Sequence, residues 1–423
     1  MSNWLPSERQ VSFEPESDPM RKQILEGIKI ADFSWVVVGS VVTRCLADFG
    51  ATVVRIESAT NPDILRVSPP FKDSLPGLNR SGYFANYNAN KHGLSLNLKH
   101  PKGLAVAKRL IAWADVVCES FTPGTMADWG LGYEDLKRIK PEIIMLSTCN
   151  LGQTGPLARQ PGYGTQLVSL AGFTHLSGWP DRLPAQPYGA YTDTIAPHFA
   201  IAGIMAALDY RRRTGRGQYL DLSQLEAAIH FLAPVILDYT VNGQKWIRLG
   251  NRCSQAAPHG VYPCRGEDRW CAIAVFSDQE WQALCHIVGH AEWGHDPRFD
   301  TLSDRKQNED DLDRLIGLWT RERQAEEVID LLQAAGVACG VVQTGEDIHE
   351  DPQLQHRRHL QVLPHPEIGL HSYDSQSFQL SETPSRLERP GPCLGEHTEY
   401  VCKEFLGMSD EEFVTLLNEG VFE

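Results

Sequence analysis

The chain has 423 residues, of which 42% are hydrophobic and 22% are charged, proportions that are typical of a soluble globular protein. Its 54 Asp and Glu residues outnumber its 39 Lys and Arg residues, which gives a formal net charge of -15. This balance argues against nucleic acid as a partner, because phosphate binding needs a basic face, but it is compatible with a small anionic ligand.

We expect the N-terminal segment, residues 1–24, to form an arm that is not part of a packed domain. It is polar and has no apolar core like that of a signal peptide. The most apolar stretch, residues 33–50, is interrupted by Ser, Gly, Arg and Asp and is too short to cross a bilayer. The ten cysteines include no Cys-x-x-Cys pair, which favours free thiols in a reducing compartment. We therefore expect a cytoplasmic protein with no membrane partner.

From residue 27 the sequence alternates short apolar runs with stretches of helical periodicity. "GIKIADFS" predicts a strand, and residues 41–58 predict a helix, a glycine turn and a second strand. Residues 100–120 and 133–150 each repeat the order of helix and strand. Continuous apolar strands that alternate with helices predict an α/β fold with a parallel sheet and right-handed crossovers.

The second half of the chain predicts a smaller domain. Residues 195–240 are expected to form helices, and from about residue 245 an antiparallel hairpin is followed by further helices. We predict an arm and three segments, with a small α+β domain inserted into a larger α/β domain. Their bounds are 1–24 for the arm, 25–225 for the first part of the large domain, 226–335 for the small domain and 336–423 for the return to the large domain.

Motifs for well-known chemistries are weak in this sequence. Only Gly39 follows the first strand, so the dinucleotide pattern Gly-x-Gly-x-x-Gly is absent. His286 and His290 share a helical face, but no third ligand follows at a convincing spacing, and we predict no metal site. Nucleophile elbow, P-loop and zinc-helix motifs are also missing. The residues alone indicate an α/β protein that binds a small molecule.

Five segments, in order along the chain, resemble the family III CoA-transferases, the group of formyl-CoA and carnitine CoA-transferases and α-methylacyl-CoA racemase. They cover residues 27–58, 88–103 ("NANKHGLSLNLKHPKG"), 114–156, 206–227 ("AALDYRRRTGRGQYLDLSQLEA") and 395–400 ("GEHTEY"). The resemblance implies a Rossmann-like large domain built from both chain ends, a smaller domain, and two subunits interlocked like links of a chain. It also implies that coenzyme A, carried as an acyl-CoA, is a substrate.

The catalytic group of the family is an Asp carboxylate. By the resemblance, it attacks an acyl-CoA to give a mixed anhydride and then an aspartyl-CoA thioester, and the acceptor acid reverses the sequence. This chain has Gly164 at that position, after Gly162 and Tyr163, and glycine cannot attack. The resemblance further implies contacts with CoA from four residues: Val36, Ser58, Asn90 and Lys91.

Three interpretations are open. The chain is a subunit without a nucleophile in a hetero-oligomer whose related subunit carries the Asp, as in benzylsuccinate CoA-transferase; the aromatic, proline-rich residues 175–191 then favour a bulky or aromatic acid. Alternatively, the chain is an active transferase with a displaced carboxylate, Asp193 or, as another candidate, Asp181. The third interpretation is a CoA-ester isomerase or an acyl-CoA-binding protein without transferase activity.

Overall fold

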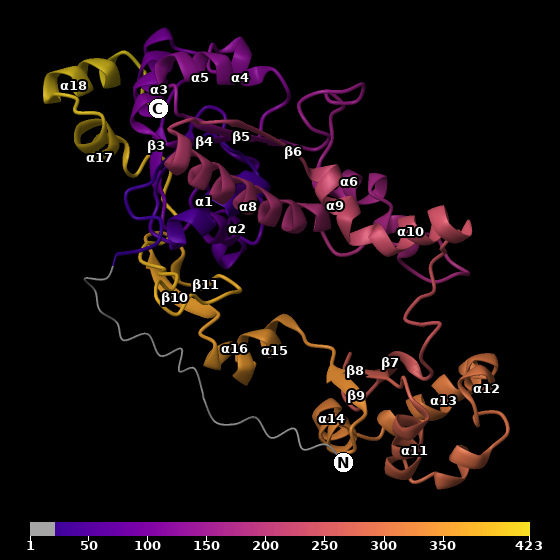
Figure 1. Ribbon diagram of the computed structural model, residues 1–423. Coiled ribbons are helices and arrows are strands. Elements are labelled where there is room, and N and C mark those ends of the chain that lie inside the picture. Colours follow the sequence, from indigo (N-terminus) through magenta and orange to yellow (C-terminus); the bar gives the residue numbers. More distant parts are fainter. Residues whose placement is uncertain (1–21) are drawn as a thin grey trace. The chain divides into compact units, whose positions relative to one another are not determined.

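The computed structural model describes residues 22–423 and divides into two compact units (Figure 1). Of the described residues, the larger unit contains 22–173, 187–243 and 355–423. The smaller unit contains residues 174–186 and 244–354. Most of the predicted N-terminal arm lies outside the described residues.

The larger unit is built on a parallel six-stranded sheet of order β3-β2-β1-β4-β5-β6 (Figure 1). Its strands are β1 (Lys29–Asp32), β2 (Thr52–Glu57), β3 (His92–Ser95), β4 (Val116–Glu119), β5 (Ile144–Cys149) and β6 (Tyr219–Ser223). The apolar runs that predicted strands are therefore central strands, as expected when helices cover both faces of a sheet. The predicted α/β class is confirmed.

Successive residues of β1 enter different cores, because side chains alternate across a strand. Ile30 packs with Ile204 of the helix α8 (Tyr191–Thr214), in the core that also contains α1 (Val38–Asp48). Ala31 packs in the opposite core with α3 (Pro101–Trp113) and with Phe413 of α18 (Asp410–Asn418). The end of the chain thus completes the larger unit, as the sequence predicted.

Shorter helices complete this unit. They are α2 (Gly82–Tyr87), α4 (Thr125–Asp128), α5 (Tyr133–Ile139), α6 (Gly164–Leu170), α9 (Gln224–Ile229), α10 (Ala233–Asn242) and α17 (Thr398–Tyr400). An antiparallel hairpin, β10 (Leu360–His365) and β11 (Gly369–Asp374), also belongs to it. Two further helices span the limits between the units, α7 (Phe173–Leu176) and α16 (Pro352–His356).

The smaller unit has an antiparallel sheet of order β7-β8-β9, which includes the predicted hairpin. Its elements are β7 (His259–Pro263), β8 (Trp270–Ala274), α11 (Asp278–Ile287), α12 (Leu302–Gln307), α13 (Glu309–Thr320), α14 (Ala325–Ala334), β9 (Ala338–Val341) and α15 (Gly345–Glu350). The limits differ from the predicted segment 226–335, because α10 stays with the larger unit and β9 pairs with β8. Pairing between distant segments sets these limits.

The ten cysteines are free. Across residues 22–423, none of the helices has the length and apolar character that would let it cross a membrane. Within the same residues, the side chains of His, Cys, Asp and Glu form no group of three or more that could hold a metal ion.

Candidate functional site

The first residue of α6, Gly164, packs against the beginning of α8. A β-carbon added at Gly164 would lie 2.6 Å from the β-carbon of Ala190 and would overlap Oδ1 of Asp193. Carbon atoms in proteins pack at about 3.5–4.0 Å, so a side chain at position 164 requires Ala190 or the helix that follows it to move. The local packing is therefore built for glycine, and it brings Gly164 and Asp193 together.

Asp193 lies in the first turn of α8 and is 7% exposed. Burial raises the pKa of its carboxyl group to about 6, and a hydrogen bond from the hydroxyl of Thr192 at 3.5 Å opposes this only weakly. A negative charge at this position also interacts favourably with the helix dipole. The carboxyl group is therefore poised to change protonation below neutral pH, and it lies where the chain has no side chain at position 164.

One tyrosine, Tyr83, lies near enough to this carboxylate to interact with its charge. The rings of Tyr83 and Tyr87, one turn apart on α2, have centroids 5.0 Å apart. Burial raises the pKa of Tyr83, and the charge of Asp193 and the phenol of Tyr188 raise it further. Tyr188 itself is fully exposed. Sequence reasoning missed Tyr83 and Tyr87, although their spacing in "GYFANY" places them on one helical face.

Val36 connects this region to the sheet. It packs with Tyr83 and Tyr87 in one apolar cluster, and the neighbouring Val38 packs with Ile195 of α8 in another. Val36 lies in the loop after β1, and the chain order places β1 beside β4, where the direction of strand progression reverses. Ligands of open α/β sheets bind beyond the carboxyl ends of the strands at such a switch point. The structure thus brings one predicted CoA contact into the neighbourhood of Asp193.

The loops after β1 and β4 are tied together at this switch point. The backbone N–H of Trp35 donates to Oγ of Ser120 at 2.8 Å, and the same hydroxyl donates to the carbonyl of Trp35 at 2.9 Å. The rings of Trp35 and Phe121 meet edge to face with centroids 5.7 Å apart. Both loops are therefore held in a fixed position relative to the sheet.

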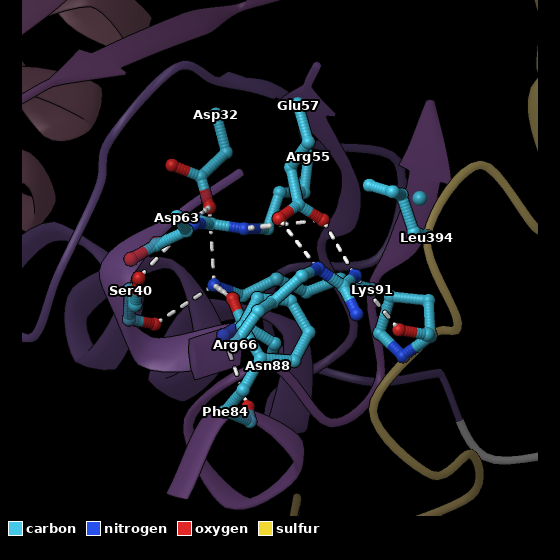
Figure 2. Close-up of polar contacts among 12 residues, drawn as sticks. Asp32, Ser40, Arg55, Glu57, Asp63, Arg66, Phe84, Asn88, Lys91 and Leu394 are labelled. Carbon is cyan, nitrogen blue, oxygen red and sulfur yellow. Dashed lines mark hydrogen bonds and ion pairs between the residues drawn. The ribbon is translucent and has the colours of Figure 1, made fainter. Parts of the chain in front are cut away.

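Lys91 lies inside the larger unit. Its ammonium group donates to Asp32 at 3.0 Å, to Asn88 at 2.9 Å and to the carbonyl of Ser40 at 2.9 Å (Figure 2). Burial lowers the pKa of Lys91 to about 8, against the attraction of Asp32. A contact between Lys91 and CoA stays a prediction, and it would require this network to open, because Lys91 is fully buried.

Asn90 and Ser58 contact the C-terminal part of the chain. The amide of Asn90 donates to Asp48 and to the carbonyl of Arg386, both at 2.7 Å. Ser58 follows β2, and its hydroxyl donates to the carboxylate of Glu423. These contacts place both residues at the junction between the sheet and the end of the chain. Their contacts with CoA also stay predictions.

A buried ionic network lies beneath the loop that contains Val36, and the sequence did not predict it. Arg66 forms two hydrogen bonds with Glu57, at 2.8 and 2.7 Å (Figure 2). Arg55 pairs with Asp63, and its guanidinium group also donates to the carbonyl of Ser34 at 2.6 Å. Each carboxylate of this network has a cationic partner, which buried charges require.

Comparisons with known proteins agree with this architecture. The sequence model of the family described as CoA-transferase family III matches residues 25–398. A succinyl-CoA:glutarate CoA-transferase of Mus musculus is 30% identical over 97% of this chain and 92% of its own length. The beta subunit of a succinyl-CoA–L-malate CoA-transferase of Chloroflexus aurantiacus is 31% identical over 94% and 98%. The crystal structure of a CaiB/BaiF family protein from Brucella suis matches with a TM-score of 0.84 and 29% identity over 91% of this chain and 100% of that one.

Proposed function

This chain belongs to CoA-transferase family III, and we propose that it works as a subunit that does not carry the nucleophile. A related subunit of a hetero-oligomer supplies the Asp that position 164 lacks. CoA then moves from a donor acyl-CoA to a carboxylic acid. The observation that carries this proposal is the closed space at Gly164, where Ala190 and Asp193 leave no room for a side chain.

The chemistry follows from that division of labour. A carboxylate oxygen of the partner's Asp attacks the thioester carbonyl and displaces the CoA thiolate. The product is a mixed anhydride of the Asp and the donor acid. The thiolate then attacks the Asp carbonyl, which releases the donor acid and leaves an aspartyl-CoA thioester. The acceptor carboxylate attacks this thioester and repeats the two exchanges in reverse, so that the Asp is regenerated. In this chain, the loop that contains Val36 would hold CoA at the switch point.

The exposed apolar surface of α10 supports the proposal that this chain binds a partner subunit. The helix has an apolar sequence, "APVILDYTVN", yet none of its residues is buried in the larger unit. Ile236, Leu237, Tyr239 and Val241 are all exposed on it. An apolar helix in contact with water indicates a protein interface. The related protein of C. aurantiacus is named as a beta subunit, which fits an assembly of unlike chains.

Succinyl-CoA is the donor that we propose, because the names of the relatives specify it. The acceptor that we propose is a bulky or aromatic acid such as benzylsuccinate. Tyr83 interacts with the charge of Asp193 and lies beside Tyr87, and aromatic rings offer both apolar area and hydroxyl groups to a ligand of this kind.

A second candidate is an enzyme that is active without a related partner and uses Asp193 as its nucleophile. It is favoured by the position of the Asp193 carboxylate, which takes the space next to Gly164, and by its raised pKa of about 6. At neutral pH most of this carboxylate is ionised and can attack. The difference from the first proposal lies in which chain carries the covalent intermediate.

Reconstitution tests the proposal. The chain is expressed alone and together with a related subunit that has Asp at the position of Gly164, and transfer from succinyl-CoA to benzylsuccinate is assayed. We expect activity only from the pair, with Asp193→Asn leaving it within about twofold. Activity of the chain alone that Asp193→Asn abolishes would establish the second candidate instead.

A further inference from the structure

Val36 has a backbone conformation that its side chain disfavours. Its φ is 63°, in the left-handed region. A β-branched residue rarely adopts this conformation, which persists only where the surrounding structure holds it. The loop with this conformation lies at the switch point of the sheet, so the groups that hold it determine the shape of the surface there.

Asp63 holds the backbone of Val36 directly. The N–H of Val36 donates to both carboxylate oxygens of Asp63, at 3.2 and 3.1 Å. Asp63 is fully buried, and it also accepts a hydrogen bond from the N–H of Leu65 at 2.9 Å, at the beginning of the 3-10 helix Ile64–Val67. Arg55 pairs with the same carboxylate (Figure 2). The acceptor is thus fixed by its own helix and by a buried cation.

The residues before Val36 are fixed as well. The carbonyl of Ser34 accepts from Arg55, and both backbone groups of Trp35 bond to the hydroxyl of Ser120. Rotation at Val36 is therefore the remaining way for this loop to relax. Without the acceptor on Asp63, the cost of the left-handed conformation would be unopposed, and Val36 would turn its N–H and side chain away from their present positions.

We propose that Asp63 is a positioning residue that holds the loop of Val36 in the conformation that receives CoA. The part that concerns CoA rests on the proposed function, because the contact between Val36 and CoA was predicted from the family. The hold of Asp63 on Val36 stands on the geometry alone. An experiment can therefore contradict the role of the loop in CoA binding without contradicting the hold of Asp63 on Val36.

The test compares four variants by the Kd for CoA in titration calorimetry: Asp63→Asn, a matched control, Val36→Gly, and the double variant of Asp63 and Val36. Asp63→Asn is expected to weaken binding by roughly tenfold, the change that corresponds to about 1.4 kcal/mol. Glu309→Gln is the matched control, since Glu309 is a buried carboxylate of the smaller unit that pairs with Lys306 and does not belong to the network of Asp63. Its Kd should equal that of the unmodified chain. In the double variant with Val36→Gly, Asp63→Asn should cost less than about twofold, because glycine adopts this φ without strain.

Amide hydrogen exchange gives a measurement that needs neither enzymatic activity nor CoA. The N–H of Val36 should exchange slowly in the unmodified chain, and Asp63→Asn, which leaves one acceptor oxygen and removes the charge, should make it exchange faster. Rapid exchange at Val36 would overturn the hold, and so would equal weakening of CoA binding by Asp63→Asn and Glu309→Gln. Slow exchange in a chain that does not bind CoA would leave the hold intact and contradict the proposed function. An unchanged Kd in Asp63→Asn would overturn the role in CoA binding.

Discussion

The carboxylate of Asp193 lies in the space that a β-carbon at Gly164 would need. The two residues lie in the first turns of different helices, α6 and α8, and the close approach of these helices depends on the missing side chain. The position at which relatives of this family are expected to carry a nucleophile is therefore packed and closed. An aspartate could return to it only if its neighbours moved.

The packing at Gly164 predicts that even alanine is costly there. Gly164→Ala should destabilise the chain by about 1–3 kcal/mol, the usual cost of forcing extra atoms into a packed site. Gly345→Ala is the matched control, because Gly345 also begins a helix and has no atom within 4 Å of an added β-carbon. Denaturant unfolding measures both. Equal stability of the two variants would contradict the packing account. Gly164→Asp should likewise add no transferase activity.

The raised pKa of Asp193 predicts a pH-dependent effect on stability. Burial moves this pKa from 3.8 to about 6, so the folded chain binds the proton more tightly than the unfolded chain does. The group favours folding below pH 3.8, and this contribution is lost as the pH rises through about 6. Asp193→Asn should therefore raise the melting temperature at about pH 8 by a few degrees and change it little at about pH 4. A constant difference across this range would contradict the raised pKa.

The lowered pKa of His92 predicts that the chain loses stability in acid. Burial, together with the charges of Arg389 and His397, lowers this pKa from 6.5 to about 3. Because the unfolded chain then binds the proton more readily, the stabilisation is present above pH 6.5 and is lost as the pH falls towards 3. His92→Phe can keep the contacts with Tyr400 and Phe405. We expect the free energy of unfolding of this variant to fall by about 2 kcal/mol less than that of the unmodified chain between about pH 7 and pH 5.

Replacement of the exposed His349 by Gln is the control for that measurement, and it should leave the pH dependence of unfolding as it is in the unmodified chain. If His92→Phe and the unmodified chain lose stability in parallel, another group causes the acid sensitivity.

The carboxylate of Glu423 would compete with CoA for the hydroxyl of Ser58. It accepts hydrogen bonds from the hydroxyl of Ser58 and from the N–H and hydroxyl of Thr60, the latter two at 3.1 and 3.0 Å. If Ser58 contacts CoA, this carboxylate must leave first. Glu423→Gln, which weakens a charged hydrogen bond, should lower the KM for acyl-CoA by roughly twofold to tenfold and leave kcat unchanged. Glu419→Gln is the control, since Glu419 pairs with Lys102 instead. An unchanged or higher KM would show that Ser58 is not a CoA contact.

The sheet could be predicted because each of its central strands is a short apolar run that is recognisable from its own residues. The runs around Ile30, Val53 and Val116 are apolar on both faces, and the intervening helices have their own periodicity. The buried network could not be predicted in this way. Arg55 lies in an apolar strand, and its ion pairs with Asp32 and Asp63 form only when folding brings the three residues together. The contact between Gly164 and Asp193 joins residues 29 positions apart, and no sequence spacing encodes it.

The measurement that tests the central claim is borohydride trapping of the covalent intermediate. This chain and a related subunit are incubated together with succinyl-CoA and treated with borohydride, which reduces an aspartyl-CoA thioester to an alcohol that peptide mass spectrometry locates. We predict that the modified residue is the partner's Asp and that Asp193 is unmodified. A reduced side chain at Asp193 would contradict the account and make this chain the carrier of the nucleophile.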